Sequence, residues 1–302
     1  MPAKLIQLIV VLTMCSTALA YGQASPSSAL RFTADGQFVL VPNADALDNI
    51  AGELTIEAWV KPEAGILSRG YDSIISKQMS GTGYMLATNI ASPEERFKAE
   101  VAGMQVTSAS QPAINAWQHV AAVWEGQLKI YVNGQLDGVI DTGHPIPNSF
   151  PLWIGSSPFG ADTNWRGAID EVRIWAVARS QSEIQAAMSQ SLCGHEPGLR
   201  AYWSFDEGEG QVLHDTVGQN DGQINGPVWV PGVELARPSC EPVGDVGGSV
   251  TGFRPALIVC RNVTTGRRVV IQDHEISWNC ETAGLEITSG DVILINILGG
   301  TK

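Results

Sequence analysis

Three side chains alternate along the segment GELTIE: Glu53, Thr55 and Glu57. Alternate residues of a strand share a face, so these two carboxylates could converge on one glycosidic bond, as hydrolysis of that bond requires. Thr55 carries no charge to push the two glutamate pKa values apart, which the acid and nucleophile roles need. The alternative is structural, with Glu53 ending a loop and Glu57 paired with a Lys or Arg. We favour it, and keep Glu53 and Glu57 only as alternative catalytic residues.

A second group of carboxylates lies in the glycine-rich segment FDEGEGQVLHDTVGQNDG, which we expect near the strand that carries Asp170. Carboxylates and carbonyls freed at glycine turns suit Ca²⁺, which takes roughly six to eight oxygen ligands. The candidate ligands of a structural calcium are Asp170, Asp215 and Asp221. The alternative is that Asp215 and Asp221 accept hydrogen bonds from their own turns.

The loop SSPFGADTNWRG, residues 156–167, places aromatic and polar side chains between two strands. Sugar recognition needs flat aromatic faces together with amides and charged groups. Most other tryptophans fall inside alternating strands, where core packing explains them. The predicted ligand-binding residues are Trp165, Asn164, Arg166, Phe159 and Tyr84, the last on a facing strand.

The elements that must position these residues are strands. Apolar residues recur with period two in about eleven segments over roughly 200 residues, enough for two packed antiparallel sheets. In WQHVAAVWEGQLKIYVNGQLDG, the pair Asn133-Gly134 predicts a tight hairpin turn. One helix is expected after Ser180, which forms a capping box with Glu183.

The two ends of the chain differ in composition from this region. Residues 1–20 combine Lys4, an apolar run and the Ala18-Leu19-Ala20 pattern, which predicts a removed secretory signal rather than a membrane anchor or a lipidated Cys15. Residues 234–252 form a glycine-rich linker, and residues 253–302 contain short apolar segments typical of a small β module. The expected location is secreted, periplasmic or at the cell surface, with no transmembrane segment in the mature chain.

Secretion permits disulfides, and four cysteines remain after signal removal. Their spacing is not a zinc pattern, and three connectivities are possible. The predicted pairs are Cys193 with Cys240 and Cys260 with Cys280. The net charge of −13 disfavours nucleic acid as a partner.

Several segments together resemble the laminin-G-like, concanavalin A-like lectin/glucanase superfamily: LTIEAWVKP, GYMLAT, the hairpin segment, LWIGSS, WRGAIDEVRIWAVARSQSEI and GLRAYWSFDEGEG. The resemblance covers residues 28–233 and implies an all-β, antiparallel two-sheet jelly-roll sandwich with one short helix. The C-terminal module resembles no family. Glucan-cleaving members carry E-x-D-x-E on one strand, and this chain departs from that pattern at Thr55.

The resemblance and the candidate residues together predict a secreted, non-catalytic binding protein. The expected partner is carbohydrate or a glycoconjugate, and the possible cofactor is structural Ca²⁺. The alternatives are a glycoside hydrolase that uses Glu53 and Glu57, and an adhesion module that binds an extracellular protein.

Overall fold

The computed structural model describes residues 5–11, 27–48, 52–63, 71–79, 81–89, 94–144, 146–159, 163–218, 220–238, 240, 247–249, 254–262, 268–271, 277–279 and 292–300. Outside residues 27–240 it describes only the backbone. The chain divides into two units, one spanning Ala24–Ser239 and the other combining Met1–Gln23 with Cys240–Lys302.

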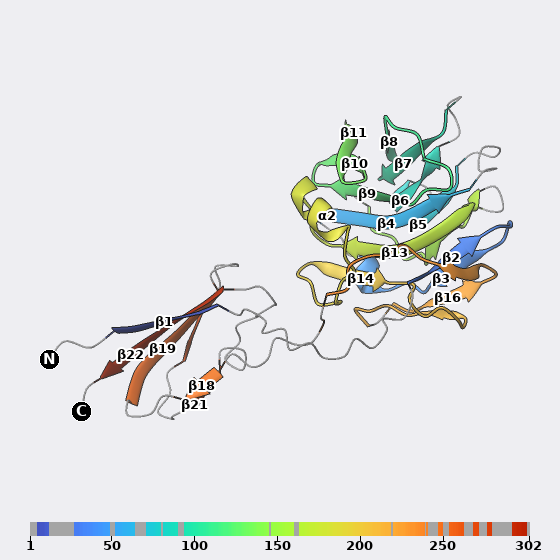
Figure 1. The fold of residues 1–302 in the computed structure, drawn as a ribbon. Coiled ribbons are helices and arrows are strands. Elements are labelled where there is room, and N and C mark those ends of the chain that lie inside the picture. Colours follow the sequence, from blue (N-terminus) through green and yellow to red (C-terminus); the bar gives the residue numbers. More distant parts are fainter. Residues whose placement is uncertain are drawn as a thin grey trace. The chain divides into compact units, whose positions relative to one another are not determined.

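The larger unit is built from two eight-stranded sheets (Figure 1). The first sheet, in the order β11-β10-β9-β4-β13-β2-β17 with β14 paired to β13, contains β2 (Ser28–Phe32), β4 (Leu54–Pro62), β9 (Gln118–Trp124), β10 (Gln127–Val132), β11 (Gln135–Asp141), β13 (Gly167–Trp175), β14 (Leu199–Trp203) and β17 (Val228–Pro231). The second, in the order β15-β16-β3-β12-β5-β6-β7-β8, contains β3 (Phe38–Val41), β5 (Ser73–Met79), β6 (Thr82–Asn89), β7 (Arg96–Val101), β8 (Met104–Thr107), β12 (Leu152–Ile154), β15 (Val212–Leu213) and β16 (Gly222–Asn225). The pairing is antiparallel, which confirms the predicted all-β sandwich.

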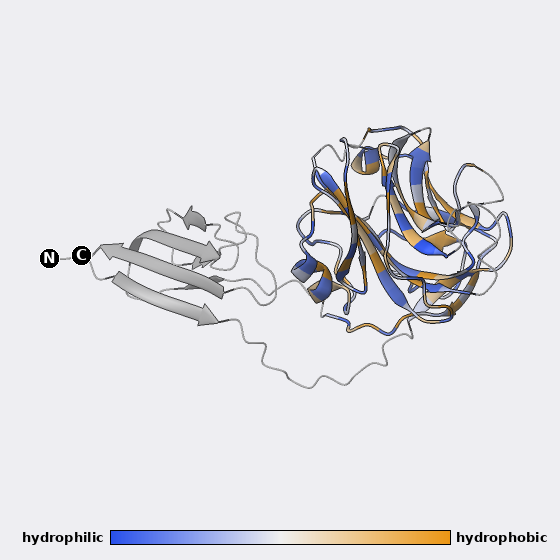
Figure 2. Ribbon diagram, turned by 90° about the horizontal axis from the view of Figure 1, so that it is seen from above, coloured by the Kyte–Doolittle hydropathy of each residue, from blue (hydrophilic) through white to orange (hydrophobic). Residues whose placement is uncertain are grey.

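The core lies between the two sheets and follows from the period-two pattern. Along β4, Ile56, Ala58 and Val60 point into it, and Phe97 and Ala99 of β7 enter from the other sheet. Figure 2 shows hydrophobic and hydrophilic residues alternating along the strands of this unit. Burying a large apolar side chain stabilises the fold by roughly 1.5–3 kcal/mol, so this alternation fixes which face of each strand turns inward.

A helix covers the outward face of the first sheet. Helix α2 (Gln181–Ala187) begins at the predicted capping box, where Ser180 accepts from the backbone of Glu183 and Glu183 accepts from the backbone of Ser180. Ile184 packs on Ala121, Val123 and Tyr131. Helix α2 lies beside this sheet (Figure 1), and the residues of β4, β9 and β13 are nearly all buried. A second, short helix, α1 (Asp45–Asp48), follows β3.

The predicted turn between β10 and β11 is confirmed. Asn133 and Gly134 both have positive φ, 49° and 71°, as a type I′ turn requires. The side chain of Asn133 also accepts a hydrogen bond from the backbone N–H of His119 at 3.0 Å, which ties the turn to β9.

In the smaller unit, four strands form one antiparallel sheet in the order β1-β22-β19-β20. These are β1 (Leu5–Val11), β22 (Val292–Gly300), β19 (Arg254–Asn262) and β20 (Arg268–Ile271), and β18 (Gly247–Ser249) pairs separately with β21 (Ser277–Asn279). Strand β1 lies in the segment predicted to be a removed signal, and that removal stays a prediction. Cys280 lies outside the described residues, so the predicted pairing of Cys260 with Cys280 also stays a prediction. Among the described residues, no helix is long and apolar enough to cross a membrane.

Cys193 and Cys240 are both disulfide-bonded, as their predicted pairing requires. Nearby, the backbone of Ala236 exchanges hydrogen bonds with Ser189 and Ser191. Backbone hydrogen bonds therefore hold the segment that follows β17 to the residues after α2.

Replacing Cys193 and Cys240 with serine should lower the free energy of unfolding by about 2–4 kcal/mol, because the unfolded chain gains conformational freedom. Urea unfolding of the double variant beside the native protein measures this loss. An unchanged unfolding midpoint would show that the bridge constrains only a segment that is already frayed.

Candidate functional site

Glu57, the alternative catalytic residue, is fully buried beneath α2. Its carboxylate accepts a hydrogen bond from Trp175 Nε1 at 2.9 Å, and Arg179 Nη1 lies 3.4 Å from the same oxygen. His119 Nε2 lies 3.4 Å from the other oxygen. Burial opposes ionisation, but His119 and two arginines, Arg173 and Arg179, outweigh it and lower the pKa of Glu57 to about 2. Glu57 is thus a structural anion that is ionised at neutral pH.

The other two residues of the GELTIE pattern also bind the connection between β13 and α2. Glu53 is exposed and accepts from the backbone N–H of Ala178 at 3.1 Å. Thr55 donates to the carbonyl of Val177 at 2.8 Å and accepts from the N–H of Arg179 at 3.0 Å. Glu53, Thr55 and Glu57 therefore share a face, as predicted, but they use it to hold residues 177–179 against the sheet.

A β-bulge places a second buried carboxylate beside Glu57. The register of β13 against β4 shifts between Asp170 and Arg173, and Glu171 takes a left-handed φ of 53°. Its side chain accepts from Arg173 Nη2 at 2.6 Å and from the Tyr202 hydroxyl at 2.9 Å. These charge-assisted bonds compensate the backbone strain of a non-glycine residue in this region. Sequence patterning did not single out Glu171, because a bulge interrupts the alternation.

The oxygens of the predicted calcium ligands are occupied by N–H donors. Asp215 accepts from the backbones of Tyr202, Val217 and Asn220 and from the side-chain amide of Asn220, at 2.7–3.1 Å. Asp221 is exposed, and its carboxylate meets the backbone N–H of Asp215 and the ring of His214. Both carboxylates thus accept hydrogen bonds from backbone N–H groups of their own loop, which is the alternative to calcium binding that the sequence offered.

Asp170 is also unsuited to an ion. It is fully buried, and its two oxygens accept from the backbone N–H groups of Glu171 at 2.8 Å and Val233 at 2.9 Å. Burial, followed by the neighbouring Glu171, raises the pKa of Asp170 well above its usual range. In the described part of the chain, no three Asp, Glu, His or Cys side chains gather as a metal site. These three residues do not fit Ca²⁺.

The five predicted ligand-binding residues do not form one accessible site in the structure. Trp165 is completely buried in the core between the sheets, so its ring has no exposed face for a sugar. Asn164 is buried and accepts from the backbone of Gly36 at 3.3 Å, and Arg166 forms an ion pair with Asp35. Phe159 remains 47% exposed. A tryptophan in a loop can turn inward as readily as outward, and composition does not distinguish the two.

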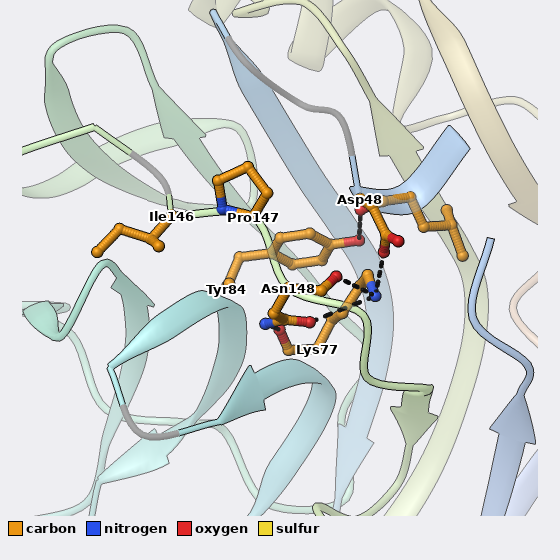
Figure 3. Close-up of a pocket in the computed structure, with 8 residues that line it drawn as sticks. Asp48, Lys77, Tyr84, Ile146, Pro147 and Asn148 are labelled. Carbon is orange, nitrogen blue, oxygen red and sulfur yellow. Dashed lines mark hydrogen bonds and ion pairs between the residues drawn. The ribbon is translucent and has the colours of Figure 1, made fainter. Parts of the chain in front are cut away.

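Tyr84, the fifth residue, lines a small hollow at the rim of the sandwich (Figure 3). Lys77 is buried there, with its ammonium 2.5 Å from Asp48 and within hydrogen-bonding distance of Asn43 and Phe150. The hollow holds about 10 Å³, near the roughly 10–15 Å³ that one water needs, and is far too small for a sugar. Lys77 anchors α1 and the segment before β12.

The outward face of the second sheet carries an aromatic patch that the sequence reasoning missed. Because Val39, Leu152, Ile154 and Ile224 point into the core, their neighbours point outward. The patch consists of Phe38 and Leu40 of β3, Trp153 of β12, and Gln223 and Asn225 of β16. Phe38 and Trp153 are partly exposed with ring centroids 4.6 Å apart, and both amide residues are exposed.

Cross-strand pairing brings the amides to the rings. Asn225 pairs with Phe38 and Gln223 with Leu40, while Leu40 pairs with Trp153. Side chains directly opposite each other lie about 4.5–5.5 Å apart at Cβ. The sequence feature that could have predicted this patch is the alternation in FVLV and LWI. In these strands Phe38 and Trp153 alternate with core residues and therefore point away from the core.

Comparison with known proteins places the chain in a family. A laminin G-type family model described as the Concanavalin A-like lectin/glucanases superfamily matches residues 33–185. Human pappalysin-1 is 28% identical in an alignment of 189 positions that covers 54% of this chain and 11% of pappalysin-1.

Solved structures are similar in fold. A Bacteroides ovatus protein, provisionally described as carbohydrate binding, has a TM-score of 0.58 and 22% identity over 70% of this chain and 62% of its own. A heptameric SAP-like pentraxin from Limulus polyphemus has a TM-score of 0.44 and 18% identity over 54% of this chain and 82% of its own. The chain therefore spans a small part of pappalysin-1 and under two thirds of the Bacteroides protein. Since the family model covers just over half of the chain, the protein belongs to the concanavalin A-like lectin/glucanase superfamily.

Proposed function

We propose that the protein binds carbohydrate or a glycoconjugate, without cleaving it, on the aromatic patch of the second sheet. The observation that carries this proposal is the partly exposed Phe38–Trp153 pair beside the exposed amides of Gln223 and Asn225. Aromatic rings pack against the apolar faces of a pyranose, and amides both donate to and accept from its hydroxyls.

The position of the patch in the fold supports the same proposal. The outward face of the first sheet is closed by α2 over Ala121, Trp175 and Tyr202. The hollow beside Lys77 is too small for a sugar. The aromatic patch, by contrast, brings aromatic and amide side chains together on strands that are accessible.

The family and its members are consistent with sugar as the ligand. The superfamily includes both lectins and glucanases, so membership alone does not decide between binding and cleavage. The similar Bacteroides protein carries a provisional carbohydrate-binding description. Its identity of 22% supports a shared fold, and the ligand has to be argued from the patch.

An extracellular location is part of the proposal. The predicted signal in residues 1–20 supports it, as does the bonded state of Cys193 and Cys240, because structural disulfides persist in oxidising compartments. An extracellular protein as ligand is the alternative to a glycan.

The environment of Glu57 argues against hydrolysis. A catalytic acid needs a pKa close to the working pH, whereas Glu57 is buried with a pKa of about 2 and faces Arg173 and Arg179. Glu53, its potential partner, is exposed and engaged with the backbone of Ala178.

Glu57→Gln should lower the free energy of unfolding at pH 7 by about 3 kcal/mol, because Arg173 and Arg179 lose a buried counter-charge. Since the folded pKa of about 2 lies below the ordinary 4.5, the charge stabilises the fold above pH 4.5. That contribution is lost as the pH falls from 4.5 towards 2, so the difference between native and variant should shrink over this window.

Urea unfolding at pH 7 and at several lower pH values measures the effect, with exposed Glu53→Gln as the matched control, expected to change stability by under about 0.5 kcal/mol. A Glu57→Gln protein of native stability that had lost release of reducing ends from a glycan would instead identify a hydrolase.

Trp153→Ala should weaken glycan binding by roughly tenfold or more, because a lost stacking face costs about 1.4 kcal/mol. A glycan array, with CaCl₂ and with EDTA, first finds a ligand for the native protein. Titration of that glycan into native and variant proteins then gives the ratio of dissociation constants.

Trp229→Ala is the matched control, because Trp229 is partly buried on β17 of the first sheet and its indole donates to Gly210 at 3.2 Å. Its glycan affinity should stay at the native value. Equal affinities for native and Trp153→Ala would remove the patch from the proposal. A native protein that binds no glycan but captures an extracellular protein would favour the adhesion alternative.

A further inference from the structure

Three oxygen-bearing side chains meet at one end of β5, β6 and β7. Asp72 directly precedes β5, Thr88 lies in β6, and Glu95 directly precedes β7. The backbone N–H of Thr88 donates to the carbonyl of Asp72 at 2.9 Å, and Thr88 pairs with Phe97, two residues after Glu95. The topology therefore brings the three side chains to one place, although they are far apart in sequence.

These side chains are buried without the partners that burial demands. Thr88 is 0%, Asp72 4% and Glu95 7% exposed. Asp72 Oδ2, Thr88 Oγ1 and Glu95 Oε1 are each buried and lack a hydrogen-bond partner among the described residues. Burial raises the pKa of Glu95, and the nearby hydroxyl of Thr88 lowers it in part. Thr88 Oγ1 and Glu95 Oε1 nevertheless do not meet the geometry of a hydrogen bond with any partner that the structure describes. A buried carboxylate that stays ionised without a partner costs several kcal/mol, so these two carboxyl groups are relieved either by protonation or by a bound cation.

The nearby cation does not supply that charge. Arg166 acts on Asp72, but its guanidinium forms its ion pair with Asp35. Burial, followed by the repulsion of Glu95, raises the pKa of Asp72 to about 7 despite Arg166. The carboxyl groups of Asp215 and Asp170 differ, because backbone N–H groups satisfy them.

We propose that Asp72, Thr88 and Glu95 bind a divalent cation, Ca²⁺ in preference to Mg²⁺. The donors are two carboxyl groups and a hydroxyl, all hard oxygen ligands, and they carry two negative charges once cation binding has displaced their protons. The donors come from one strand and from the residues before two others, an irregular arrangement of the kind that the flexible coordination of Ca²⁺ tolerates and octahedral Mg²⁺ does not. Water completes the shell. The site is distinct from the aromatic patch and from Asp170, Asp215 and Asp221.

Calorimetric titration of CaCl₂ into the EDTA-treated, dialysed protein tests the proposal, with thermal unfolding in CaCl₂ or in NaCl of equal ionic strength as a second measurement. We expect one Ca²⁺ per chain and a melting temperature that rises with CaCl₂ but not with NaCl, because ligand binding to the folded state stabilises it. Asp72→Asn and Glu95→Gln should each weaken calcium binding by roughly tenfold or more and abolish most of that rise.

Two controls separate this site from others. Glu94→Gln removes a neighbouring exposed carboxylate that pairs with Arg96, and Asp221→Asn removes one from the loop first considered for calcium. Both variants should bind calcium as the native protein does. In EDTA, Asp72→Asn should be at least as stable as the native protein, because it removes an unpaired buried charge.

The proposal is overturned if the native protein takes up no calcium, or if Asp72→Asn and Glu95→Gln bind it with native affinity. A folded Asp72→Asn protein that is much less stable than the native protein in EDTA would also overturn it, because it would show that the charge of Asp72 is already compensated within the chain.

Discussion

The buried negative charge of Glu57 determines which face of the sandwich is closed. Its carboxylate lies on the outward side of β4, where an ion could persist only if positive groups and donors surrounded it. Arg173 of β13, Arg179 before α2 and Trp175 supply them. Arg173 Nη1 also donates to the carbonyl of Ala187 at the end of α2, at 3.0 Å. The charge network and the helix therefore require each other, and together they cover the first sheet.

That closure leaves the second sheet to meet other molecules. Its outward residues alternate with core residues such as Val39 and Ile154, so a core that fixes one face of β3 and β12 also fixes Phe38 and Trp153 on the other. The rings stand on paired central strands rather than on a loop, which gives them a rigid position. A preorganised aromatic surface loses little conformational entropy when a ligand packs against it.

The fold could be predicted well from the sequence because a sandwich depends on period-two alternation. The helix and the hairpin could be predicted because a capping box and a tight turn each have a local sequence signature. The sequence predicted the site poorly because side-chain direction in loops is set by tertiary packing. Trp165 turns into the core, while the equally loop-borne Phe159 stays exposed. Phe38 and Trp153 were not predicted to bind a ligand, because aromatic residues in alternating strands usually pack in the core. Strands as short as β15 and β16, which complete the sheet beside Phe38, carry too few residues to show alternation.

The acidic residues show the same limit most clearly. Asp215 lies just after the two-residue strand β15 and Asp72 just before β5, and their local sequence does not reveal which carboxyl group the fold supplies with donors. In the structure, Asp215 receives N–H donors from its own turn, through Val217 and Asn220, and from Tyr202 of β14, whereas Asp72 faces the carboxyl group of Glu95. Whether a buried carboxylate finds donors depends on which backbone N–H groups the fold brings to it, and local sequence does not reveal that. The net charge of −13 adds a further constraint, since a surface of that sign repels anions at long range. We therefore expect the aromatic patch to select neutral sugars over sulfated or sialylated ones, unless a bound cation offsets the charge locally.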